Sequence, residues 1–151
     1  MRFGKKTILG AAAAATLALT SAAMAQMKPE ETLKMRQGLM LAVKSQFVPL
    51  GAYAQGKADL PADAAKRAEN LVALAKLAPS GWPKGSEGLK DSATKVEAFT
   101  SPDFVKGWEI MGAAVAKLDA AAKTGNGDAI KVAAGEVGKT CKGCHDDFKK
   151  E

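Results

Sequence analysis

The chain has 151 residues, of which 47% are hydrophobic and 25% are charged, a composition that fits one ordinary globular domain. The formal net charge is +6, but Arg2, Lys5 and Lys6 supply three of these charges at the extreme N-terminus. The remaining lysines are interleaved with acidic residues instead of clustering, so the charge gives no reason to expect nucleic-acid binding.

Residues 1–25 are predicted to be a secretory signal peptide that is removed from the mature protein. The basic head is followed by an uncharged, alanine-rich run, and Ala23-Met24-Ala25 fits the small-x-small pattern of a cleavage site. A membrane anchor is the alternative, because an apolar run can also span a bilayer. The alanine content and the cleavage site favour removal. We therefore expect residues 26–151 to form one mature domain in the periplasm, without a membrane anchor.

The mature chain begins with two segments whose apolar residues recur at helical spacing. The first is expected to run from about Pro29 to about Ala54, and the second opens at residues 60–63 and is stopped by Pro79. Pro49 lies inside the first pattern, and we expect it to bend the last turns of that helix.

A connection rich in Gly, Pro, Ser and charged residues follows at residues 80–100, with room for a short turn of helix. The third helix is predicted to start near Ser101 and to end before Gly125, and the fourth to run from Asp128 to the C-terminus. No strand-like alternation appears. The pattern therefore predicts an all-α domain, an antiparallel four-helix bundle.

The last predicted helix carries the sequence Cys141-Lys142-Gly143-Cys144-His145, which is the attachment signature of a c-type haem. Residues at i and i+3 of a helix project to the same side, so the two thiols can each form a thioether with one vinyl group of a single porphyrin. The histidine, one turn after the first cysteine, can then bind the iron from beneath the ring. We predict one covalently bound haem c per chain, with His145 as an axial iron ligand.

Three other interpretations use the same residues. A structural zinc site needs four Cys or His ligands, whereas the chain has two cysteines and one histidine. A thioredoxin-like redox pair needs a βαβ context, which is absent from the pattern. A disulfide between the two neighbouring cysteines leaves the histidine without a role. Haem attachment accounts for all three residues.

The sixth iron position has several candidate ligands. Because His145 is the only histidine, the choice within one chain is methionine, lysine, water or no ligand. Met40 falls on the apolar stripe of the first helix and is the methionine best placed to face the distal side; the alternative is that it only packs in the core. The other candidates are Met27, Met35 and Met111.

Arg36 falls on the same apolar stripe, one turn before Met40. A buried guanidinium is costly unless it is paired and hydrogen-bonded. A haem propionate would supply such a partner, a carboxylate such as Glu87 could do the same, and both can hold at once.

Four segments resemble the class II c-type cytochromes, and specifically the cytochrome c′ family. The resemblance covers essentially the whole mature chain, and the segments together are more specific than the haem motif alone. They are residues 34–40 (KMRQGLM), 56–61 (GKADLP), 85–88 (GSEG) and 138–149 (GKTCKGCHDDFK).

The resemblance implies a left-handed up-down-up-down bundle and a homodimer that contacts through its first two helices. It also implies that four polar residues surround the haem and its propionates, namely Arg36, Gln37, Ser86 and Glu87. Lys149 stands where many members have an arginine near the proximal histidine, which keeps the charge but loses the planar fork.

In function, the resemblance implies a five-coordinate, high-spin iron whose distal face is blocked by Met40 and opens to NO or CO. The protein is also expected to exchange single electrons with periplasmic partners, without substrate turnover of its own. The alternative is a low-spin electron-transfer cytochrome of the same class, with Met40 as the sixth ligand. A peroxidase or nitric-oxide reductase would need a distal acid–base group, and the chain has no second histidine to serve as one.

Overall fold

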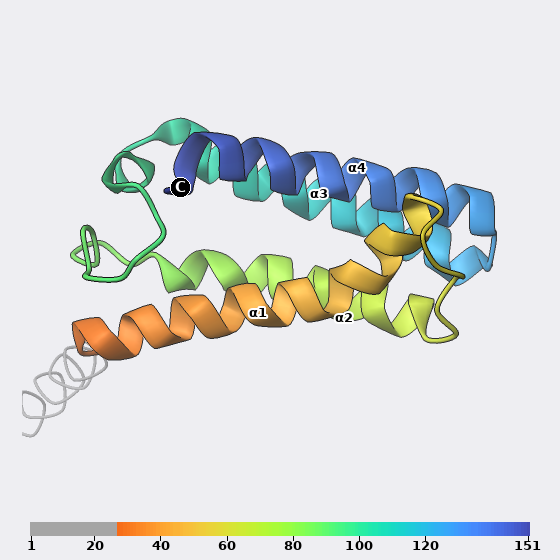
Figure 1. The fold of residues 1–151 in the computed structure, drawn as a ribbon, viewed down its shortest axis with the longest axis horizontal. Helices are drawn as coiled ribbons and strands as arrows, with labels where there is room; N and C mark the ends of the chain where they lie inside the picture. The colour runs from red at the N-terminus through yellow and green to blue at the C-terminus, as the bar shows by residue number, and fades with distance from the viewer. Residues whose placement is uncertain (1–26) are drawn as a thin grey trace, which may run out of the picture.

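The computed structural model describes residues 27–151, so the predicted signal peptide lies outside the described residues. Four α-helices alternate in direction along one axis, as Figure 1 shows. This arrangement confirms the predicted all-α, up-down-up-down four-helix bundle. The helices are α1 (Pro29–Ala54), α2 (Ala64–Leu77), α3 (Pro102–Thr124) and α4 (Gly127–Phe148).

Local capping explains where α3 begins and ends and where α4 begins. The Ser101 hydroxyl accepts a hydrogen bond from the Asp103 amide at 3.2 Å, which satisfies one free N–H of the first turn of α3. Gly125 ends α3 with a φ of +70°, a conformation that favours glycine. The Asn126 side chain then accepts from the Ala129 amide at 3.0 Å and starts α4 one residue before the predicted Asp128.

Helix α1 continues through Pro49 to Ala54. Beyond this proline its last turns change direction toward the start of α4 (Figure 1), where the Tyr53 hydroxyl lies close to Gly127. The bend that the sequence predicted at Pro49 is therefore present, and it brings the end of the first helix onto the last one.

The connection between α2 and α3 contains two short 3₁₀ helices, η1 (Ala78–Gly81) and η2 (Val96–Phe99). Pro79 lies in η1, so it stops α2 as predicted. Near its end the connection pairs with the C-terminus through an isolated antiparallel bridge between Thr94 and Lys149.

The core is one cluster to which all four helices contribute. The largest fully buried side chains are Leu50, Leu71, Leu118, Ile130, Val115 and Val137.

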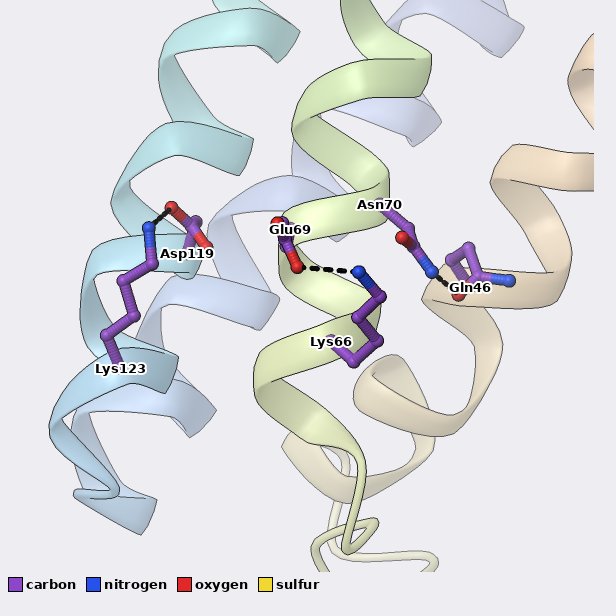
Figure 2. A network of polar contacts seen from close by, with 6 residues as sticks. All are labelled: Gln46, Lys66, Glu69, Asn70, Asp119 and Lys123. Atoms are coloured by element: carbon purple, nitrogen blue, oxygen red, sulfur yellow. Dashed lines mark hydrogen bonds and ion pairs between the residues drawn. The ribbon is translucent and has the colours of Figure 1, made fainter.

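A band of polar contacts crosses the outer side of α1, α2 and α3 (Figure 2). The side-chain Nδ2 of Asn70 in α2 donates to the side-chain Oε1 of Gln46 in α1 at 3.1 Å. Within α3 the Lys123 ammonium pairs with Asp119 at 2.6 Å, and within α2 Lys66 pairs with Glu69 at 2.9 Å. Exposed pairs of this kind contribute little to stability.

In the part of the chain that the structure describes, none of the helices combines the length and the apolar character needed to cross a membrane.

Candidate haem-binding site

A cavity of about 500 Å³ is lined by α1, α3, α4 and parts of the α2–α3 connection. Its size is within the range of about 300–1,000 Å³ that is usual for sites that enclose a small molecule. Eight of the residues singled out from the sequence line it together, and these are Arg36, Gln37, Met40, Met111, Cys141, Cys144, His145 and Lys149.

The haem motif lies in the last two turns of α4, with both cysteines and His145 on the cavity. Both thiols are free and half-buried. Burial raises the pKa of the Cys141 thiol, and burial together with Cys141 and Asp147 raises the pKa of the Cys144 thiol. Two free thiols one turn apart, next to an exposed imidazole, are the arrangement that attachment of a porphyrin requires.

Two of the four candidate methionines reach this cavity. Met40 of α1 is half-buried and Met111 of α3 is buried, and both are part of the lining. Met27 is exposed and Met35 is half-buried, and neither lines the cavity. The choice among methionine ligands therefore narrows to Met40 and Met111.

Arg36 is only 3% exposed, and its guanidinium binds the α2–α3 connection at three places. Nε donates to the Gly81 carbonyl at 2.9 Å, and Nη1 donates to the Ser92 hydroxyl at 2.9 Å. Nη2 donates to the Ser86 hydroxyl at 2.8 Å and to the Ser86 carbonyl at 3.3 Å. Since a guanidinium has five N–H groups, one N–H on Nη1 has no acceptor among the described residues.

Two aromatic rings enclose the same guanidinium. Its carbon lies 5.3 Å from the centre of the Trp82 ring and 5.2 Å from that of Phe99, within the range of a cation–π contact. Burial lowers the pKa of Arg36, and the charge of Glu87 partly opposes this shift. Among the described residues no ion pair joins Arg36 to Glu87, so the partners of the buried charge are hydroxyls and carbonyls.

Ser86 and Glu87 lie behind Arg36 and not on the cavity. Ser86 is buried, and its hydroxyl donates to the Pro83 carbonyl at 2.7 Å while it accepts from Arg36. The Glu87 carboxylate accepts from the Gly85 amide at 3.1 Å, and hydrogen bonds from backbone amides hold its pKa below the usual range. A role for these two residues at the haem itself stays a prediction.

Sequence reasoning missed the aromatic wall of the cavity. Trp82, Phe104, Trp108 and Phe148 contact one another in a chain of tilted and edge-to-face pairs, with ring centres 5.3–6.1 Å apart. Phe104 and Trp108 recur one turn apart on α3, and this spacing was the signal in the sequence. Ser92 and Thr94 were missed as well, because they lie in a connection without periodicity.

The lining fits a covalently attached haem. It offers two free thiols, one imidazole and largely apolar walls. The Nε1 atom of Trp108 is a buried donor that has no hydrogen-bond partner among the described residues. A buried donor without an acceptor is costly, and a haem carboxylate would supply one.

Comparisons with known proteins point to one family. The sequence model described as Cytochrome C′ matches residues 31–149. Cytochrome c′ of Rubrivivax gelatinosus is 38% identical over 128 residues, which are 82% of this chain and 98% of that protein. The structure of cytochrome c prime from Shewanella frigidimarina has a TM-score of 0.77 at 30% identity and covers 84% of this chain and 100% of that one. A ferrous variant of Alcaligenes xylosoxidans cytochrome c prime with bound NO has a TM-score of 0.71 at 31% identity, over 84% of this chain and 99% of that one.

Proposed function

The chain belongs to the cytochrome c′ family and binds haem c covalently, and we propose that it is a periplasmic protein that binds NO or CO and exchanges single electrons. Bound haem supplies an iron that can take up one electron or one diatomic ligand. In this proposal Cys141 and Cys144 hold the porphyrin by thioethers. The His145 imidazole is the one protein ligand of the iron, which makes the metal five-coordinate and high-spin.

The observation that carries this proposal is the asymmetry of the cavity lining. On α4 the lining includes one imidazole, His145. On α1 most of the lining is apolar, including Met40, Val43 and Phe47, and its polar members are Arg36, Gln37 and Lys44. An apolar wall excludes water and admits a small uncharged gas. In this arrangement Met40 restricts the distal space by its bulk. The NO complex of the Alcaligenes relative supports gas binding by this class of site.

The second candidate is a low-spin electron-transfer cytochrome in which Met40 is the sixth ligand. It is favoured by the presence of Met40 and His145 on the same cavity, since a thioether sulfur is an established haem ligand. The two candidates differ in what the Met40 sulfur does. In the first the side chain only occupies space, and in the second it donates an electron pair to the metal.

Electronic absorption and resonance Raman spectra of the ferric and ferrous protein test the choice. We expect high-spin spectra for the natural protein and the same spin state for Met40→Leu. A low-spin natural protein with the long-wavelength band of methionine-ligated ferric haem, converted to high spin by Met40→Leu, would establish the second candidate instead. Met35→Leu is the matched control, because Met35 does not line the cavity.

The remaining parts of the proposal have separate tests. We propose that the protein does not turn over a substrate, and rapid peroxide consumption by the purified protein would contradict this.

We propose export through the signal peptide at residues 1–25, which recovery of a shortened, haem-containing chain from the periplasmic fraction would support. The homodimer through α1 and α2 stays a prediction for sedimentation analysis.

A further inference from the structure

Four residues of the α2–α3 connection, 92–95, form a segment that we call the strap. It runs antiparallel to the end of α4 and is joined to it by backbone hydrogen bonds. The Lys95 amide donates to the Phe148 carbonyl at 2.9 Å, and the Lys150 amide donates to the Ala93 carbonyl at 2.8 Å. The strap thus holds the residues that directly follow the haem motif.

The Lys95 side chain adds a second attachment to α4. Its ammonium donates to the Asp147 carbonyl at 2.8 Å and lies 3.4 Å from the Asp146 carbonyl. These are free carbonyls at the C-terminal end of the helix, where a positive charge is favourable. The His145 carbonyl accepts from the Lys149 amide at 3.1 Å, so the turn that carries the imidazole continues directly into the segment held by the strap.

At its other end the strap is bound to α1. The buried Ser92 hydroxyl accepts from Arg36 Nη1 at 2.9 Å and from the Thr94 amide at 3.2 Å. The Thr94 hydroxyl accepts from Trp82 Nε1 at 3.0 Å, and the Trp82 ring lies against the Arg36 guanidinium. Ser92 and Thr94 are 4% and 8% exposed, so water competes little for these contacts.

A continuous set of contacts therefore links two sides of the cavity. Arg36 lies one turn before Met40 on α1, and Lys149 lies one turn after His145 on α4. We propose that the strap positions the His145 turn relative to α1, with Ser92 as the positioning residue that joins Arg36 to the C-terminal end of α4. This inference rests on the proposed role of His145 as the iron ligand.

The position of the histidine turn matters because the imidazole is the one protein ligand in the proposed site. A displacement of that turn would move the His145 imidazole, and would thereby change how firmly the haem-loaded protein binds a gas. Buried hydrogen bonds hold such a turn more firmly than exposed ones. The strap would thereby make the position of the His145 imidazole depend on Arg36 of α1.

The test compares the haem-loaded protein with Ser92→Ala and with the matched control Ser80→Ala. The Ser80 hydroxyl is exposed and donates only to the Leu77 carbonyl. Hydrogen exchange measures the Lys95 and Lys150 amides, and resonance Raman of the ferrous protein measures the iron–histidine stretch. We expect exchange of these two amides to rise about tenfold in Ser92→Ala, the effect of losing roughly one buried hydrogen bond, together with a shifted or broadened iron–histidine band.

Lys95→Met is the second variant, with Lys90→Met of the same connection as its control. It removes the ammonium from the Asp147 carbonyl and leaves Ser92 and Arg36 unchanged, so it tests the α4 side of the strap if Ser92→Ala folds poorly. We expect the same shift of the iron–histidine band in Lys95→Met and none in Lys90→Met.

Two results would overturn the proposal. The amides could exchange faster while the iron–histidine band stays unchanged in both variants, which would make the strap a purely structural feature. The amides could also keep their protection in Ser92→Ala, which would show that Ser92 does not hold α4. Loss of the iron–histidine band from the natural protein is a different outcome, because it contradicts the proposed function itself.

Discussion

Arg36 shows how far a single residue could be predicted from the sequence. Its place on an apolar stripe predicted a buried charge with a partner, and the structure confirms the burial. The partners could not be predicted, because Gly81, Ser86 and Ser92 lie 45–56 residues away in a connection without periodicity. Among the described residues, hydroxyls and carbonyls hold the charge and no carboxylate is paired with it, whereas a propionate as a further partner stays a prediction.

Arg36→Met is expected to lower the free energy of unfolding by about 3 kcal/mol, since it leaves the Gly81 carbonyl buried without its donor. Arg36→Lys should also destabilise, because an ammonium cannot reach the separate acceptors that the planar guanidinium reaches. Urea unfolding followed by circular dichroism measures both changes. Arg67→Met is the control, since Arg67 pairs with the exposed Asp63 and should change stability by less than about 1 kcal/mol. Equal losses in Arg36→Met and Arg67→Met would contradict the assignment.

Removal of both motif cysteines tests whether they attach the haem. Cys141→Ser with Cys144→Ser is expected to leave the imidazole in place but to abolish covalent attachment, so that any haem is released on denaturation. Haem staining after denaturing electrophoresis, with the intact mass, measures this. A double variant that still retains haem under denaturing conditions would show that other residues attach it.

At the scale of the elements, the helices and the existence of the α2–α3 connection were predicted well, whereas the path of that connection was not. Helices depend on local signals, namely apolar residues at helical spacing and caps such as Ser101 and Asn126. The path of the α2–α3 connection depends on contacts between segments far apart in the sequence, such as the pairing of Thr94 with Lys149. The haem motif is a local pattern, so it could be predicted from the sequence. The aromatic wall and the strap depend on contacts between distant segments, so they could not.

Replacement of Asp119 of α3 with alanine should raise the free energy of unfolding. Its side chain is 16% exposed, and its Oδ1 atom is buried with no partner among the described residues. Asp119→Ala loses the Lys123 pair of Figure 2, worth about 0–1 kcal/mol, and removes an unsatisfied oxygen that costs about 1–3 kcal/mol. We therefore expect a gain of about 1 kcal/mol in urea unfolding. Glu136→Ala, which breaks the exposed pair with Lys139, is the control, and a clear loss of stability in Asp119→Ala would refute this reasoning.

The whole molecule divides into a packed part and a hollow part. None of its six largest fully buried side chains lines the cavity. On α3 and α4 these side chains fall at residues 115–137, on either side of the turn between the two helices, whereas the cavity is lined by residues 104–111 of α3 and by the end of α4 from residue 140. The stability of the hollow part is therefore expected to depend on what fills the cavity.

Protein that lacks haem should accordingly lose amide protection unevenly. We expect residues 36–47 and 141–149 to exchange rapidly in the double cysteine variant without haem, while the amides around Leu118 and Ile130 stay protected. Hydrogen exchange of the haem-free and haem-loaded forms measures the difference. Covalently attached haem is buried in the cavity only in the native state, so the haem-loaded form should also have the higher midpoint of thermal unfolding. Uniform loss of protection would indicate that the bundle unfolds as a single unit.

The short turn between α1 and α2 lies at the end of the bundle opposite the C-terminus (Figure 1), and Lys57, Ala58 and Asp59 there are exposed. Extra residues at such a surface turn need not disturb the helices that it joins. A dye, an affinity tag or an electrode linker grafted between Lys57 and Asp59 would therefore immobilise the protein with the haem-motif end of the bundle directed outward.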